Sequence, residues 1–466
     1  MTAGRAARAA PRPRTARTLL ARGYWHVRPG GRERLHRLLR ESERLPPEEL
    51  AQLQLEAARE LLASARSIPF YRDRLQAVSL EPEDLRSIGD LAALPPLERH
   101  ELLEHGVRGL RGPGPGGIVR TSSGSTGTPV QVLWGRTMRA WAAAVERRSL
   151  DWVGIPPGSR LDYIRGRPAR QRTWIAGRAR AGMSNWRLVD ASHVANAEER
   201  RALVDRLMRD PPTVLSGPAP CLYLLALAVL EDGRTPGFQA CLSHGSQLHE
   251  HYRRAIEAAF RCPVWERAGT VETGVIVHPC REASSLHMPA EVLYVEVVRA
   301  DGSHADAGEL GHVLVTTLRN PAMPLIRYRT GDVAVRRDDR CSCGRTLPML
   351  ERMVGRAPDL LVTSDGSLIP PWDVVRSAVA SAPEAVLDLE VVQRENLGLD
   401  VRLVLRQGGQ AVDAGRKVGD ALDELVGIPG ATTVEAVDSI PFSASGKRRH
   451  LVSQAHAAAV RAEIGR

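Results

Sequence analysis

Lysine is almost absent from this chain of 466 residues. Of its 64 basic residues only two, Lys417 and Lys447, are lysine, and all the others are arginine. Such a bias replaces lysine wherever positive charge alone is needed, so a surviving lysine is a candidate for a site where arginine would not serve, and chance survival is the alternative. Lys417 lies in an amphipathic helical pattern and is expected to be solvated. Lys447 lies in the turn-rich stretch IPFSASGKRRHLV, where it could reach a phosphate or a carboxylate.

Long apolar runs are also missing. The longest candidate, CLYLLALAVL at 221–230, is shorter than the roughly 18 residues that cross a bilayer, so we expect a buried helix there. The arginine-rich beginning has no continuous apolar segment of the secretory kind. With 43% hydrophobic residues the chain can bury large cores, and its length suggests two or three domains. We therefore expect a cytoplasmic, enzyme-sized protein without a membrane span.

The net charge of +10 is concentrated at one end of the chain. Residues 1–40 hold eleven arginines and one glutamate, so residues 41–466 are close to neutral. We predict that residues 1–30 form a basic, disordered arm, and contact with a membrane surface or a polyanion is the alternative. Because the charge is so localised, nucleic-acid binding is not expected.

Hydrophobic periodicity predicts an α/β protein built from successive patterns. Residues 31–105 show apolar positions three and four apart behind acidic helix starts, which indicates helices. Residues 115–280 alternate strand and helix patterns, which favours a mainly parallel sheet. Residues 290–353 are predicted to form a β-rich subdomain. After GRAPD at 355–359, a unit of about 107 residues with strand patterns and two helices is predicted to be a small α+β lid.

The stretch TSSGSTGTPV at 121–130 begins with eight residues that are all Ser, Thr or Gly. A flexible, solvent-exposed linker is one interpretation. The other is an anion-binding loop, in which hydroxyls and closely approaching backbone N–H groups surround a triphosphate. Composition alone leaves both interpretations open.

Five short stretches, in this order, resemble the core motifs of adenylate-forming enzymes: TSSGSTGTPV (121–130), RAGTVETG (267–274), YRTGDV (328–333), GRAPDLL (355–361) and PFSASGK (441–447). The segment IPFYRDRL, the short N-terminal region and CSCGRTLP at 341–348 are most similar to the phenylacetate–CoA ligase and CapK-like branch. The resemblance covers about residues 45–450. It implies a large N-terminal adenylation domain at 31–354, with mainly parallel sheets and a β-rich subdomain, and a small mobile lid domain at 355–466.

The resemblance also implies an activity, that of an AMP-forming acid–CoA ligase. ATP would activate a small carboxylic acid, expected to be aromatic, as an acyl-adenylate with release of pyrophosphate, and CoA would then accept the acyl group. An amine, a carrier protein or nitrite as acceptor stays open, as does a relative that only binds nucleotide. The implied cofactors are ATP, Mg²⁺ and CoA, and a homodimer is left open.

The same resemblance assigns roles to individual residues. Lys447 would bridge the substrate carboxylate and the α-phosphate, where negative charge gathers in the transition state. Glu272 would help to hold Mg²⁺, which prefers oxygen ligands; its alternative is a carboxylate at a helix start. Asp332 would accept the ribose hydroxyls beside Arg356, and Gly245 would lie along adenine. The loop that surrounds the β- and γ-phosphates and its neighbours would bind nucleotide through Ser122, Ser123, Gly124, Ser125, Thr126, Gly127, Thr128, Gly269 and Thr270, with Thr126 also catalytic.

Two nucleotide-binding positions depart from the family pattern. Thr128 stands where a lysine often follows the last glycine of the loop. The positive charge that such a lysine would place beside the phosphates is therefore missing. Ala268 replaces an aromatic residue that would flank adenine, so the nucleotide pocket is expected to be wider.

The expected hinge between the two domains also departs from the family pattern. Pro358 occupies a position that is usually Asp or Lys, and proline fixes φ at about −65° and biases Ala357 toward extended conformations. Either rotation moves to Asp359 and the chain is an ordinary CoA ligase, or the lid stays near its adenylation pose and the acceptor is a small molecule.

Six cysteines divide into two groups. Those in apolar settings are predicted to be buried thiols: Cys221, Cys241 and Cys262. Cys280 and His287 form C-x₆-H, and Cys341 and Cys343 form C-x-C-G. Three thiolates and one imidazole are a tetrahedral zinc set, and four protein ligands imply a structural metal. The alternative is a group of unmetallated thiols near a turn; members of the resembled branch have a zinc site at this place.

Overall fold

The computed structural model describes residues 31–113, 116–122, 128–166, 185–406, 411–441, 443 and 446–456. The predicted arm at 1–30 lies outside them, as do residues 123–127 of the Ser/Thr/Gly stretch. In the part of the chain so described, no helix is both long enough and apolar enough to span a membrane.

Helices form the beginning of the described chain, as the periodicity predicts. They are α2 Arg32–Ser42, α3 Pro47–Ala65, α4 Pro69–Ala77, the 3-10 helices η1 Pro82–Asp84 and η2 Ile88–Ala93, and α5 Arg99–Gly109. Proline begins α3 and α4, where its missing N–H removes no helical hydrogen bond. A capping box of Glu98 and Glu101 begins α5. Apolar side chains of these helices, such as Leu62 and Tyr71, are buried in one core with strands of the large sheet.

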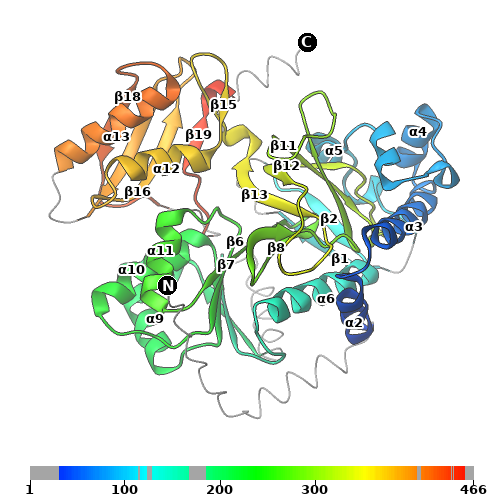
Figure 1. The fold of residues 1–466 in the computed structure, drawn as a ribbon, viewed down its shortest axis with the longest axis horizontal. Coiled ribbons are helices and arrows are strands. Elements are labelled where there is room, and N and C mark those ends of the chain that lie inside the picture. The colour runs from blue at the N-terminus through cyan, green and yellow to red at the C-terminus, as the bar shows by residue number, and fades with distance from the viewer. Residues whose placement is uncertain are drawn as a thin grey trace.

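One sheet of eleven strands runs through the larger part of the molecule, in the order β10-β11-β12-β13-β9-β8-β7-β6-β5-β3-β4 (Figure 1). Its parallel half consists of β3 Leu161–Arg165, β4 Trp186–Asp190, β5 Val214–Gly217, β6 Ala240–His244 and β7 Val264–Thr270. Its antiparallel half consists of β8 Gly274–Cys280, β9 Ala283–His287, β10 Leu293–Val298, β11 Leu310–Thr317, β12 Tyr328–Arg337 and β13 Met349–Arg356. The predicted β-rich region is therefore hydrogen-bonded to the parallel strands as one continuous sheet.

Further helices cover this sheet, and one hairpin stands apart from it. The helices are α6 Arg136–Trp152, α8 Ser192–Ala195, α9 Ala197–Arg209, α10 Ala219–Asp232 and α11 Glu250–Phe260; the hairpin pairs β1 Ile118–Thr121 with β2 Gln131–Trp134. The apolar run at 221–230 lies in α10, as predicted, and Leu225 and Ala226 are fully buried. A helix that is apolar on most sides needs such a buried position.

A separate core forms in the C-terminal unit, residues 361–453, shown at the upper left of Figure 1. Its elements are β14 Leu361–Val362, β15 Leu368–Ile369, α12 Pro371–Ser381, β16 Val386–Gln393, β17 Leu399–Leu405, α13 Ala411–Val426, β18 Thr432–Ala436 and β19 Leu451–Ser453. The three predicted strands and two helices are confirmed. The sequence did not predict β19, because three residues carry no pattern; it pairs in parallel with β16.

The connection between β13 and the C-terminal unit is the short 3-10 helix η3, Ala357–Asp359. We expected Ala357 to be extended because it precedes proline, but it is the first residue of this turn. The amide of Leu360 donates to the carbonyl of Ala357 at 3.2 Å, which closes the turn. Asp359 is 5% exposed and pairs with Arg449.

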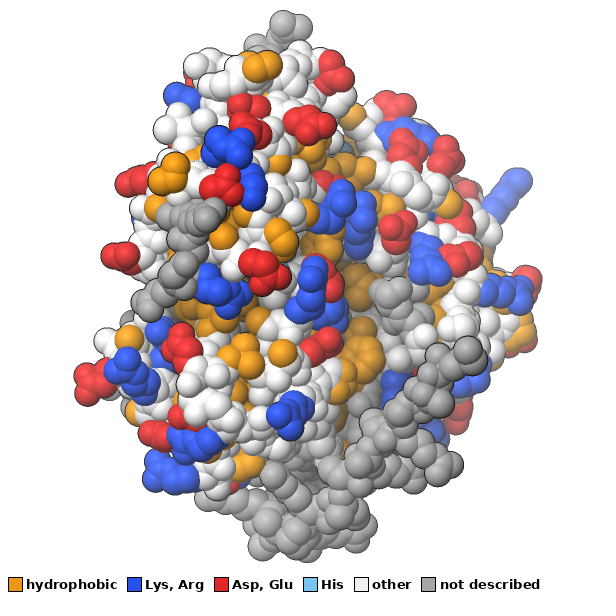
Figure 2. Space-filling model, turned by 60° about the vertical axis from the view of Figure 1, so that its left-hand side comes forward, with side chains coloured by type: hydrophobic (Ala, Val, Ile, Leu, Met, Phe, Trp, Pro, Cys, Tyr) orange, Lys and Arg blue, Asp and Glu red, His pale blue; other side chains and the backbone are white. Residues whose placement is uncertain are grey.

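Charges of both signs are interspersed on the face of the molecule that Figure 2 shows. On the face in Figure 2, blue and red side chains alternate, and its described residues form no large patch of one sign. Lys417 is among the solvated charges, as expected, and pairs with Asp413 one helical turn away at 2.7 Å.

Candidate active site

Asp332, in the middle of β12, faces Arg356, the last residue of β13. The antiparallel register pairs the two residues, and Arg356 Nη1 donates to Asp332 Oδ1 at 3.2 Å. Gly331 precedes Asp332 within β12: its φ is +80°, and a Cβ there would lie 3.3 Å from the Arg356 guanidinium. Burial raises the pKa of Asp332, and Arg356 opposes that rise. A carboxylate held in this way suits acceptance of two ribose hydroxyls.

Glu272 lies in the turn between β7 and β8 and is only 6% exposed. Its backbone carbonyl accepts a hydrogen bond from Trp134 Nε1 at 3.3 Å. Arg99 Nη1 lies 3.7 Å from Glu272 Oε1, and Arg99 Nη2 donates to the carbonyl of Thr128 at 2.7 Å. Arg99 thus joins the carboxylate to the end of the Ser/Thr/Gly stretch. Sequence analysis missed Arg99, because one arginine among so many carries no signal.

The turn that carries Glu272 is built by Gly269 and Thr270. A Cβ on Gly269 would lie 2.2 Å from the carbonyl oxygen of Gly274, so no side chain fits there. Thr270 Oγ1 accepts the amide of Thr273 at 3.1 Å. Both residues therefore shape the site, whether or not they touch a nucleotide.

The Ser/Thr/Gly stretch continues the β1–β2 hairpin. The amide of Ser122 donates to the carbonyl of Val130, and the amide of Val130 donates to Ser122 Oγ, each at 2.9 Å. The two ends of the stretch therefore lie side by side at the end of the hairpin, which favours a loop over a linker. The expected contacts of the intervening residues lie outside the described part: Ser123, Gly124, Ser125, Thr126 and Gly127.

Lys447 reaches this region from the C-terminal unit. A Cβ on Gly245 would lie 2.9 Å from Lys447 Cε, so glycine at 245 makes room for the lysine stem. Burial lowers the pKa of Lys447, while Asp332 and Glu272 raise it and Arg356 lowers it. The ammonium, both carboxylates and the guanidinium therefore interact within one site, although they come from four distant segments of the chain.

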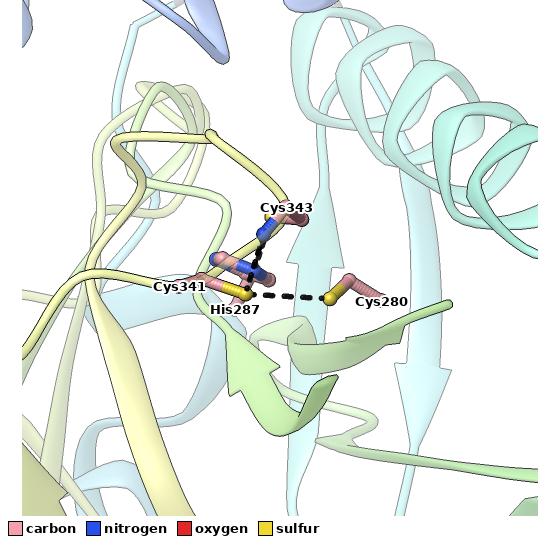
Figure 3. A group of neighbouring side chains, drawn as sticks. All are labelled: Cys280, His287, Cys341 and Cys343. Atoms are coloured by element: carbon pink, nitrogen blue, oxygen red, sulfur yellow. Dashed lines mark hydrogen bonds between the residues drawn. The ribbon is translucent and has the colours of Figure 1, made fainter. Parts of the chain in front are cut away.

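Cys280, His287, Cys341 and Cys343 lie together at the ends of β8 and β9 and in the loop between β12 and β13 (Figure 3). One donor atom from each lies within 4.8 Å of all the others. Cys280 Sγ is 3.5 Å from Cys341 Sγ, and Cys343 Sγ is 3.4 Å from His287 Nε2. The structure therefore brings the four predicted ligands together.

The surroundings of this cluster fit a metal ion. With hydrogen on Nδ1, His287 donates to the carbonyl of Leu347 at 3.3 Å, and its Nε2 faces the thiols as an acceptor. The amide of Cys343 points at Cys341 Sγ and the amide of Arg345 at Cys343 Sγ, both at 3.5 Å. These N–H groups would stabilise thiolates.

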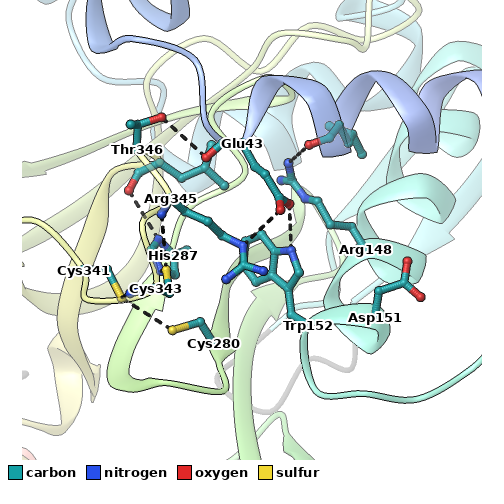
Figure 4. Close-up of polar contacts among 12 residues, drawn as sticks. Glu43, Arg148, Asp151, Trp152, Cys280, His287, Cys341, Cys343, Arg345 and Thr346 are labelled. Atoms are coloured by element: carbon teal, nitrogen blue, oxygen red, sulfur yellow. Dashed lines mark hydrogen bonds and ion pairs between the residues drawn. The ribbon is translucent and has the colours of Figure 1, made fainter.

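A second layer ties the cluster to the N-terminal helices (Figure 4). The Arg345 guanidinium lies 4.2 Å from the Trp152 ring centroid, and Arg345 Nε is 3.2 Å from Glu43 Oε1. Trp152 Nε1 donates to Glu43 Oε2 at 2.7 Å. The cluster thus connects the antiparallel strands with α2 and α6, as a structural site would.

The remaining cysteines lie away from this cluster. They are buried and free, as predicted: Cys221, Cys241 and Cys262.

Comparison with known proteins agrees with this geometry. No protein-family model matches the chain. The chain is 29% identical to a phenylacetate–coenzyme A ligase of Thermus thermophilus over 380 residues, which are 77% of this chain and 82% of that protein. The chain is similar to phenylacetate–CoA ligases over most of its length.

Solved structures of other proteins have the same fold as this chain. The chain matches 2-hydroxyisobutyryl-CoA ligase in the postadenylation state with a TM-score of 0.75, at 19% identity over 91% of this chain and 94% of that chain. The same ligase in the thioesterification state, with CoA, gives a TM-score of 0.59 at 20% identity and the same coverage. The predicted fold class is confirmed, and the two parts of this chain are arranged more like those of the postadenylation state.

Proposed function

We propose that this protein activates a carboxylic acid with ATP and then transfers the acyl group to CoA. The observation that carries the proposal is the convergence of Lys447 and Glu272 with the Asp332–Arg356 pair in one site. The names of the relatives support the same activity. We place the boundary between the adenylation part, 31–354, and the mobile lid, 355–466, within the last residues of β13, which lead into η3.

In the first half-reaction, a carboxylate oxygen of the acid attacks the α-phosphorus, and the bond to the β-phosphate breaks to release pyrophosphate. Asp332 and Arg356 would hold the ribose, while Arg99 and the Ser/Thr/Gly stretch would face the phosphates. Mg²⁺, held by Glu272, would neutralise charge on the leaving pyrophosphate. Lys447 would stabilise the negative charge that gathers between carboxylate and α-phosphate, a contribution of several kcal/mol for a preorganised cation.

In the second half-reaction, the thiol of CoA attacks the acyl carbon, and AMP leaves as the thioester forms. Lys447 has no role in this step, because its bridge between carboxylate and α-phosphate is no longer required.

We propose an aromatic acid. Three aromatic rings stack across the parallel strands next to Gly245. Tyr163, the central residue of β3, has its ring centroid 4.8 Å from that of His244, the last residue of β6, and 6.2 Å from that of Trp186, the first residue of β4, and the rings are nearly parallel in both pairs. Arg267 on β7, the strand beside β6, pairs with Glu146 on α6, and this ion pair could bind polar substituents of a ring.

We also propose a structural Zn²⁺ on the cluster of Figure 3. Three thiolates and a neutral imidazole would leave a net charge of about −1 around the ion, and Arg345 would compensate it. Four protein donors leave no open position for a substrate.

Free thiols only 3.8 Å apart at Cys241 and Cys262 support a reducing, cytoplasmic location.

The decisive experiment is acid-dependent exchange of pyrophosphate into ATP with a panel of aromatic and aliphatic acids, followed by addition of CoA to the best acid. We expect exchange with at least one aromatic acid and thioester formation with CoA. Exchange without a thioester would indicate another acceptor, and no exchange with any acid would indicate a protein that only binds nucleotide.

A further inference from the structure

A buried polar contact, which the proposed chemistry does not use, holds the C-terminal unit against α11. Tyr252 on α11 is fully buried. Its hydroxyl donates to Asp388 Oδ1 on β16 at 2.8 Å and lies 2.9 Å from His450 Nε2, just before β19. His249, at the start of α11, places Nε2 3.2 Å from His450 Nδ1. The network therefore has members from both parts of the molecule.

One placement of protons satisfies this network. Tyr252 gives its hydrogen to Asp388, which also pairs with Arg448 of its own unit. His450 Nε2–H then donates to the Tyr252 oxygen, and His450 Nδ1 accepts from His249 Nε2–H. Burial lowers the pKa of His450 to about 3 and that of His249 well below its ordinary value, so both rings are neutral, as this placement requires.

The three residues that follow Lys447 fix its loop at three places. Arg448 pairs with Asp388 on β16, Arg449 pairs with Asp359 in η3, and His450 contacts Tyr252. Of these three contacts, the one made by His450 reaches a helix of the larger part. It therefore has to break if the C-terminal unit turns away and takes Lys447 with it.

A second tyrosine supports the first at this interface. Tyr223 on α10 stacks on Tyr252, with ring centroids 4.2 Å apart, and its hydroxyl donates to the carbonyl of Leu387 on β16 at 2.8 Å. On the other side of the network, Trp372 of α12 lies 5.5 Å from His249, ring to ring.

We propose that Tyr252 is a positioning residue, which holds the C-terminal unit in the pose that places Lys447 in the active site, and whose contacts must break before acyl transfer. The inference rests on the proposed function, in which Lys447 serves adenylation alone. Tyr252 is fully buried and acts through Asp388 and His450.

Tyr252→Phe tests the proposal, because it keeps the ring and its stack on Tyr223 and leaves Asp388 paired with Arg448. We expect hydrogen exchange of the backbone amides at 446–453 to become about fivefold to tenfold faster, a measurement that needs no substrate. Pyrophosphate exchange should fall by about the same factor, while thioester formation from supplied acyl-adenylate and CoA should not fall.

Tyr71→Phe is the matched control. Tyr71 is equally buried, and its hydroxyl donates to the carbonyl of Pro324 at 2.7 Å within the larger part. This variant should leave hydrogen exchange at 446–453 and the ratio of the two half-reactions unchanged.

Unchanged hydrogen exchange at 446–453 in Tyr252→Phe overturns the proposal. An equal fall in both half-reactions, with a loss of melting temperature like that of Tyr71→Phe, overturns it as well, since a merely structural role predicts that result. If the wild-type protein shows no pyrophosphate exchange with any acid, the proposed function fails, and hydrogen exchange still decides whether Tyr252 holds the pose.

Discussion

At the scale of single residues, Lys447 carries the strongest expectation. Its ammonium interacts with Asp332, Arg356 and Glu272, and glycine at 245 makes room for its stem. Both the scarcity of lysine and the surroundings of this one assign it to the site where negative charge would gather.

We predict that Lys447→Ala abolishes acid-dependent pyrophosphate exchange, with a loss of about 100-fold or more, because the transition state loses its cation. The far-UV circular dichroism and melting temperature should stay close to wild type, since the lysine belongs to no core. Transfer from a supplied acyl-adenylate to CoA should persist. Lys417→Ala is the matched control, and exchange in Lys447→Ala within tenfold of wild type would contradict the assigned role.

The protonation of Lys447 gives a second prediction. Burial is the largest influence on its pKa and lowers it, and only the charged form can stabilise the transition state. Adenylation, followed as kcat/KM for ATP, should therefore fall as pH rises through this lowered pKa, earlier than for an ordinary lysine. In Lys447→Arg, whatever activity remains should lose this alkaline decline, because a guanidinium stays charged. The same decline in both enzymes would assign it to another group.

Arg99 gives a third prediction. Its guanidinium lies between Glu272 and the end of the Ser/Thr/Gly stretch, where Thr128 replaces a lysine. Arg99→Ala should raise KM for ATP about tenfold, as loss of a charge-assisted contact to phosphate does. Adding Thr128→Lys to this variant should lower KM for ATP part of the way back to the wild-type value.

Arg72→Ala controls for the loss of one charge, because Arg72 is exposed and, among the described residues, pairs with its neighbour Asp73 alone, at 3.7 Å. An unchanged KM for ATP in Arg99→Ala would limit Arg99 to holding the loop.

At the scale of elements, the four-residue cluster connects strands that sequence patterns treat separately. Cys280 and His287 come from adjacent strands β8 and β9, while Cys341 and Cys343 come from a loop about sixty residues later. A metal there would pin the loop to the sheet and, through Arg345 and Glu43, to α2.

We predict about one tightly held zinc ion per chain, by elemental analysis of the purified protein. Its removal, or Cys343→Ser, should lower the melting temperature and speed hydrogen exchange in β8, β9 and β13, without blocking a chemical step in molecules that remain folded. Cys262→Ser, at a buried thiol outside the cluster, should leave the zinc content unchanged. Protein without metal after careful purification would refute the site.

At the scale of the whole molecule, the expected hinge is the turn η3 between the two parts. Pro358 lies within the turn η3, and Asp359, the alternative pivot, is buried and paired with Arg449. Rotation at Asp359 would therefore have to break an ion pair as well as the Tyr252 contacts.

We predict that Pro358→Asp forms thioester faster while pyrophosphate exchange hardly changes, because the substitution frees φ at the pivot without touching the adenylation site. Single-turnover formation of adenylate and thioester, measured separately, checks this. Unchanged thioester formation would show that the proline does not limit rotation, and no thioester from either protein would favour a small acceptor.

Local sequence chemistry by itself determined many elements of this molecule. The apolar period of the first helices, the buried run of α10 and the strand patterns of the C-terminal unit depend on neighbours in the chain, and all are confirmed. Lys447, one of two lysines, and the cysteine spacing also stood out in the sequence, because rare residue types retain a signal in composition alone, and the structure brings the Cys and His donors together.

Tertiary structure decided the rest, because contacts between distant segments leave no pattern in a single sequence. The continuity of the eleven-stranded sheet depends on β13 pairing with β9, residues separated by a long stretch of other strands. Arg99 and Tyr252 have ordinary helical surroundings in the sequence. Only the folded chain sets one beside Glu272 and the other against His450, since their partners come from elements that meet when the cores pack.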